Sequence, residues 1–144
     1  MASRREQGSS LVEFGFLLPW CVFLFIGILD FGFFAYALIA TQGAARVGAI
    51  YASGSTSTAL DTATTCGYAI DQLRGLPNIG STLSTCNSSP LTVTTNLVSG
   101  SSSPDGSNAV NVSVTYVSPS LVAIPGILPG QITITKSVLM KIRS

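Results

Sequence analysis

The feature that most constrains this chain is a long apolar run near its N-terminus. Residues 14–40 are apolar or small at every position except Asp30. One α-helix of that length extends about 40 Å, whereas the hydrocarbon core of a bilayer is about 30 Å thick. The run therefore predicts a helix that crosses a membrane with a tilt or with one end protruding. A buried helix of a soluble domain is rarely so long and so uniformly apolar.

The overall composition excludes several classes of function. Of 144 residues, 47% are hydrophobic and only 9% are charged. Seven basic residues nearly balance six acidic ones, which leaves no electrostatic footprint for nucleic acid. Histidine, the residue most often used as a general base and as a metal ligand, is absent. Three scattered cysteines do not make a zinc site. We therefore expect no enzyme, no cofactor and no metal site.

The helical pattern continues beyond the apolar run. Small and apolar residues recur at helical spacing and fall on one face: Ala44, Val47, Gly48 and Tyr51. Gly54 is a typical stop signal, so we predict one helix over residues 9–53. Pro19 is either tolerated near the start of this helix or kinks it. A cleaved secretory signal, by contrast, has a short apolar core followed by a small-residue cleavage site.

The charges that flank the run predict its orientation. Arg4 and Arg5 precede it, and Arg46 follows it. Basic residues near a membrane helix are retained on the cytoplasmic side, and here two charges outweigh one. We predict a single pass with the N-terminus in the cytoplasm and the C-terminal part exported.

The exported part, residues 54–144, is predicted to be an α+β domain. A second helix is expected over residues 59–74, where Thr58 and Asp61 resemble a capping box. Its apolar stripe consists of Ala59, Ala63, Cys66, Ile70 and Leu73. Arg74, Gly75 and Pro77 are typical of a helix end.

Beyond Leu91 the apolar period changes from helical spacing to two. The segments "LTVTTNL", "AVNVSVTYV" and "QITITKSVLMKI" each alternate, and they predict three half-buried strands of a small antiparallel sheet. A Pro-Asp-Gly turn lies between the first two segments. The link "SPSLVAIPGILPG" contains three prolines, so it is not a strand throughout, but its apolar residues favour packing.

Two cysteines of the exported part are candidates for a disulfide. Cys66 lies on the second predicted helix, and Cys86 lies at the Asn- and Ser-rich stretch 78–90. Disulfides persist in oxidising compartments, and a bridge here would stabilise the fold by about 3 kcal/mol. The alternative is that Cys66 is an ordinary core residue. Cys21 lies inside the apolar run, where it acts as a small apolar side chain.

The segment "QGSSLVEFGFLL" at residues 7–18 carries a processing signal. A glycine after a short basic leader, a glutamate five residues later and an apolar helix together resemble the signature of type IV prepilins. The resemblance implies a leader 1–8, cleavage between Gly8 and Ser9, and a contact between Glu13 and the new N-terminal ammonium of a neighbouring subunit. A carboxylate in hydrocarbon is costly unless it is paired. The alternative is that Glu13 lies in the headgroup region without a partner.

The rest of the helix resembles a more specific family. The blocks "VEFGFLLP" at 12–19, "GILDFGFFAY" at 27–36 and "AARVGAIYA" at 44–52 resemble, in order and spacing, TadE-like pilin proteins. These are minor pilins, or pseudopilins, of the tight-adherence (Flp pilus) machinery. The chain departs from the family pattern at Phe33, where a polar or basic residue is frequent, and at Gly43, where Asn is frequent. Neither position belongs to the processing signal.

The apolar segment also carries candidate assembly residues. Asp30 is a second acid inside it, and such a group usually faces a partner or a helix interface. Gly27 and Gly32 lie near Asp30 and would permit close approach of another helix. Phe14 and Pro19 belong to the same segment, whose apolar face we expect to pack between subunits.

The resemblance implies a membrane and a set of protein partners. We expect a single-pass protein of the bacterial inner membrane, cut by a prepilin peptidase and assembled with other pilin subunits and the tight-adherence assembly platform. The lipid bilayer is the remaining partner, and no nucleic acid is expected.

Two alternatives use the same residues differently. One is an uncleaved single-pass protein whose exported domain binds a partner, which would make Gly8 and Glu13 incidental. The other is a pseudopilin of a type II secretion system, which shares the processing signal. A soluble enzyme is disfavoured by the missing histidine and by the apolar helix.

Overall fold

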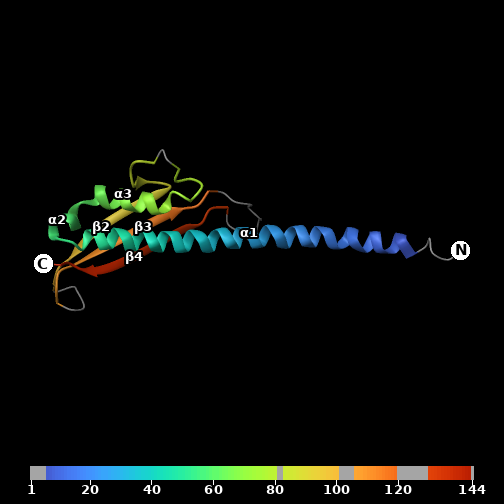
Figure 1. Cartoon of the computed structure of the whole chain (residues 1–144), viewed down its shortest axis with the longest axis horizontal. Coiled ribbons are helices and arrows are strands. Elements are labelled where there is room, and N and C mark those ends of the chain that lie inside the picture. Colours follow the sequence, from blue (N-terminus) through green and yellow to red (C-terminus); the bar gives the residue numbers. More distant parts are fainter. Residues whose placement is uncertain (1–5, 81–82, 101–105, 120–129, 144) are drawn as a thin grey trace. The chain divides into compact units, whose positions relative to one another are not determined.

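The computed structural model describes residues 6–80, 83–100, 106–119 and 130–143. It has the predicted α+β class, with a long N-terminal helix and an antiparallel sheet (Figure 1). The chain divides into two compact units, Met1–Ala35 and Tyr36–Ser144. Helix α1 (Glu6–Ala52) contributes to both units and continues through Pro19. We refer to residues 36–144 as the C-terminal unit.

Two short helices follow α1 where the sequence predicted one. They are α2 (Thr56–Leu60) and α3 (Thr62–Leu73), and Asp61 separates them with a non-helical backbone (φ −84°, ψ 77°). The capping box also lies earlier than predicted. Ser55 is the N-cap, its side chain accepts from the Thr58 N–H at 3.2 Å, and Thr58 Oγ1 accepts from the Ser55 N–H at 2.8 Å.

Asp61 has a different role from the one that the sequence indicated. It is the N-cap of α3, because its Oδ1 accepts from the Thr64 N–H at 3.0 Å. The buried side of α3 differs as well, since Ala63 is exposed. The buried residues of α3 are Thr65, Cys66, Ala69, Ile70 and Leu73. The helix ends at Leu73, one residue before the predicted end, and Arg74 is its C-cap.

The sheet has four strands, not the predicted three. They are β1 (Asn87–Ser88), β2 (Leu91–Val98), β3 (Ala109–Val117) and β4 (Thr133–Lys141), paired antiparallel in the order β1-β2-β3-β4. The strands β2 to β4 fall on the three predicted segments. The additional strand, β1, is too short to show a period of two, and its Asn-Ser composition is typical of a loop. Most of the proline-containing link between β3 and β4, residues 120–129, lies outside the described residues.

The register gives the sheet one apolar face and one hydroxyl-rich face. Leu91 pairs with Tyr116 and Val93 with Val114, and all four side chains are buried. The next residues along each strand point to the opposite face. There Thr92 pairs with Thr115, which in turn pairs with Thr135. The Thr115 and Thr135 hydroxyls are 3.0 Å apart. Such a face needs no apolar cover.

The C-terminal part of α1 packs through small residues. The buried positions of α1 in the C-terminal unit are Ala37, Thr41, Ala44, Ala45, Gly48, Ala49 and Ala52. A Cβ on Gly48 would lie 3.1 Å from Thr65 Cγ2 on α3 and 3.3 Å from Val112 Cγ1 on β3. Of the face predicted from the sequence, Ala44 and Gly48 are buried. Val47 and Tyr51 are only half-buried.

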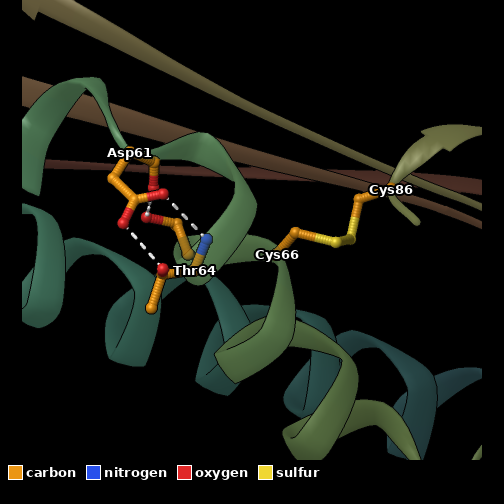
Figure 2. Close-up of a disulfide and its surroundings, with 5 residues drawn as sticks. Asp61, Thr64, Cys66 and Cys86 are labelled. Atoms are coloured by element: carbon orange, nitrogen blue, oxygen red, sulfur yellow. Dashed lines mark hydrogen bonds between the residues drawn. A yellow bond between two sulfur atoms is a disulfide. The ribbon is translucent and has the colours of Figure 1, made fainter. Parts of the chain in front are cut away.

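Two cross-links hold the segment after α3 against the rest of the C-terminal unit. Figure 2 shows Cys66 of α3 joined by a disulfide to Cys86, which directly precedes β1. Asn78 donates to the Val117 carbonyl at 2.7 Å and accepts from the Tyr116 hydroxyl, also at 2.7 Å. Burial of Tyr116 raises the pKa of its hydroxyl to about 12. The segment between α3 and β2 is therefore tied to the helix at one point and to the sheet at another.

Candidate membrane and assembly segment

Helix α1 presents an unusually apolar surface in the N-terminal unit. Almost all side chains from Leu11 to Phe31 are exposed, including Phe16 at 79% and Trp20 at 69%. Large exposed apolar patches on a folded chain mark contacts with other proteins or with lipid. Within the described residues, α1 is the one helix long and apolar enough to cross a membrane. The segment therefore has the surface of a single-pass membrane anchor.

The predicted processing residues lie at the beginning of α1. Helix α1 is described from Glu6 onward, so the backbones of Gly8 and Ser9 are helical. Glu13 follows about one turn after Ser9.

The two acids of the apolar segment have no basic partner in the described part of the chain. There, the single ion pair is Arg74 with Asp71 on α3, with 3.2 Å between Nε and Oδ1. Glu13 is exposed and Asp30 is half-exposed, both on a surface that is otherwise apolar. In hydrocarbon an unpaired carboxylate is costly, so an acid inside a membrane segment usually faces a partner.

The glycines of the segment leave open space on the helix surface. A Cβ built on Gly15, Gly27 or Gly32 would meet no atom within 4 Å. A shallow hollow near Gly27 is lined by Phe23, Leu24, Gly27, Ile28, Phe31 and Gly32. Phe14, also named from the sequence, is 66% exposed. Pro19 borders a second hollow, together with Trp20 and Phe23.

Among the described residues, Asp61 has a carboxylate that accepts several hydrogen bonds, which the sequence did not reveal. The Asp61 carboxylate accepts from the Thr64 hydroxyl at 2.6 Å and from the Thr64 N–H at 3.0 Å (Figure 2). It also accepts from the Tyr51 hydroxyl at 3.1 Å. The hydrogen bonds from Thr64 lower the pKa of this carboxyl below its ordinary value of 3.8. Tyr51 lies at the end of α1, so Asp61 joins α1 to α3. Its position before a Thr-rich helix start was the available signal.

The described part of the C-terminal unit has shallow hollows, and one of them is lined by Thr64, Gly67, Tyr68, Asp71 and Arg74. Another lies beside the disulfide and is lined mainly by hydroxyl and small side chains. Among the described residues, no group of three or more His, Cys, Asp or Glu side chains could hold a metal ion.

Comparison with known proteins gives one match. The family model described as TadE-like protein matches residues 8–49. No match to the chain is found among curated proteins or among solved structures. The matched segment begins at Gly8 and contains Glu13, Asp30 and all the exposed apolar surface of α1 described above. The match confirms the resemblance read from the sequence, and it identifies residues 8–49 as a TadE-like segment.

Proposed function

We propose that this protein is a minor pilin, or pseudopilin, that takes part in the biogenesis of a Flp-type, tight-adherence pilus. The observation that carries the proposal is the TadE-like match over residues 8–49, which begins at the glycine of the processing signal. In this proposal α1 inserts the chain into the bacterial inner membrane with residues 1–8 in the cytoplasm. A prepilin peptidase then cuts between Gly8 and Ser9.

The exposed surface of α1 supports this role. A helix that is apolar all round has two uses in a pilin-type protein: it holds the subunit in the bilayer before assembly, and it packs against other helices afterwards. Glu13 would meet the ammonium that cleavage creates on a neighbouring subunit, which satisfies both charges. The partners are therefore other pilin subunits, the prepilin peptidase, the assembly platform and the bilayer.

The C-terminal unit is consistent with export. Disulfides persist mainly outside the cytoplasm, and Cys66 is joined to Cys86. Its outer sheet face carries hydroxyl side chains and few aromatic ones, so it offers no obvious adhesive patch. We propose that the protein is not an enzyme and that it acts through assembly.

Loss of the protein tests this function. A strain that lacks it should show few or no Flp-type pili by electron microscopy, and the wild-type chain should restore them. Gly8→Val, which blocks the proposed cleavage, should fail to restore them. Gly15→Val is the matched control, because Gly15 is also in α1 and a Cβ there meets nothing within 4 Å.

Three outcomes would contradict the proposal. Normal pili in the strain without the protein would exclude a role in their biogenesis. Restoration by Gly8→Val would favour the uncleaved single-pass protein. Loss of type II secretion with normal pili would favour the secretion pseudopilin.

A further inference from the structure

The two acids of the apolar part of α1 lie on one seam of the helix. Spacings of three and four residues alternate without a break through Glu13, Phe16, Trp20, Phe23, Gly27, Asp30 and Phe34. This alternation places all of them on one side of an α-helix and is the pattern by which two helices pack lengthwise. Because α1 is apolar all round, its aromatic residues do not show which side faces another helix. The two acids do, because they are the only charged residues from 11 to 35 and they lie on this side.

Gly27 gives the same seam a point of close approach. It precedes Asp30 by three residues, so the two positions are neighbours on the helix surface. A Cβ on Gly27 would meet nothing within 4 Å. The hollow beside it, lined by Phe23 and Phe31 among others, can receive side chains of another helix. Small residues at such points let membrane helices approach until polar groups can bond between them.

The chemistry of Asp30 indicates what the other helix presents. A protonated carboxyl has one O–H donor and a carbonyl acceptor, so a second protonated carboxyl satisfies both. A second copy of this chain, inserted in the same direction, carries its own Asp30 at the same depth in the bilayer. Its Gly27 would lie at the same level too. A second copy is therefore complementary to the part of the seam that holds Gly27 and Asp30.

We propose that, in the membrane, α1 pairs with α1 of a second copy, parallel and in register along this seam. Gly27 packs against Gly27, and a hydrogen bond joins the two Asp30 carboxyl groups. The pair belongs to the membrane-resident protein, because a stagger along a filament axis would move the two Asp30 residues to different levels. The proposed pair depends on the membrane insertion of α1, and it does not depend on the rest of the proposed pilus role.

Cysteine cross-linking in native membranes tests the seam. In a Cys21→Ala background, Phe23→Cys places a thiol on the seam, whereas Phe25→Cys places one on nearly the opposite side of α1. Both are exposed phenylalanines, two residues apart. With mild oxidant, Phe23→Cys should give several-fold more disulfide-linked homodimer than Phe25→Cys.

Four further variants, each combined with Phe23→Cys, test the contacts. Asp30→Leu should lower homodimer formation roughly threefold to tenfold, as expected for one interhelical hydrogen-bonded contact in a membrane. Asp30→Asn should retain most of it, because an amide both donates and accepts. Gly27→Leu should reduce it by keeping the helices apart. Gly15→Leu, on another side of α1, equally open and outside the hollow beside Gly27, should not.

Three results would overturn the pair. They are equal cross-linking from Phe23→Cys and Phe25→Cys, no difference between Asp30→Leu and Asp30→Asn, or a cross-linked product that contains a different protein. The last would show that Asp30 serves another partner. Alkaline washing of the same membranes shows separately whether each variant is inserted, because an inserted chain stays with the membrane. Retention of the Cys66–Cys86 disulfide in each variant shows that the C-terminal unit still folds.

Discussion

At the residue scale, three acids of this chain differ in what they contact. Asp61 is held by three hydrogen bonds from its own chain. Glu13 and Asp30 have no basic partner among the described residues. The sequence indicated Asp61 as part of a capping box, and Glu13 and Asp30 as acids in an apolar segment. Only the fold shows that Asp61 also contacts α1, because its partner Tyr51 comes from that helix.

Asp61 should make folding stability depend on pH. Its pKa is lowered in the folded chain, so its contribution is present above the ordinary value of 3.8 and is lost as pH falls through the folded pKa. We expect Asp61→Asn to lower the melting temperature at neutral pH. The difference in melting temperature between wild type and Asp61→Asn should become smaller when the pH is lowered below 3.8. Thermal unfolding of the full chain in detergent, followed by circular dichroism, measures this.

Asp71 provides the control for that experiment. It is also on α3, but its ion pair with Arg74 is on the surface, with both side chains 66% exposed. Exposed pairs of this kind contribute little to stability. Asp71→Asn should therefore leave the melting temperature almost unchanged. An equal effect from both substitutions would contradict the role assigned to Asp61.

At the element scale, periodicity predicted the long elements and missed the short ones. The apolar run and its amphipathic continuation predicted α1 to within a few residues, and the period of two located β2, β3 and β4. The break between α2 and α3 was missed because Asp61 is a single non-helical residue inside a helical pattern. Two-residue β1 was missed because its pairing with β2 depends on tertiary context.

Two glycines should respond in opposite ways to substitution by alanine. A Cβ on Gly48 would press against Thr65 and Val112, so Gly48→Ala should lower the melting temperature. Gly67 lies inside α3 with open space around it. There, alanine should raise the free energy of unfolding by about 0.5–1 kcal/mol through its better helix propensity. Thermal unfolding of the Gly48→Ala and Gly67→Ala variants measures both effects. A higher melting temperature for Gly48→Ala would contradict the packing of α1 against Thr65 and Val112.

At the scale of the whole molecule, hydropathy and charge alone predict an apolar helix for the membrane and an exported α+β domain. In the structure, the boundary between the two compact units lies between Ala35 and Tyr36, inside α1, because the last turns of the helix pack into the C-terminal unit. Periodicity alone does not show at which residue the side chains of a continuous helix change from exposed to buried.

The disulfide should matter for the C-terminal unit as a whole. Replacing Cys66 and Cys86 together by alanine removes the constraint on the unfolded chain, and we expect a loss of about 3 kcal/mol. Denaturant unfolding of the full chain in detergent measures it. Replacing Cys21, which is unpaired, should have little effect by the same measurement. A similar loss from the Cys21 variant would contradict this assignment.

The most direct test of the account is the mass and N-terminal sequence of the chain isolated from its native membranes, with and without the prepilin peptidase. The account predicts a mature chain that begins at Ser9, and a chain that keeps residues 1–8 when the peptidase is absent. Cleavage would give Glu13 its ammonium partner, the new N-terminus of a neighbouring subunit. A chain that keeps its leader in the presence of the peptidase would contradict the pilin-type reading and leave a single-pass anchor with an exported domain.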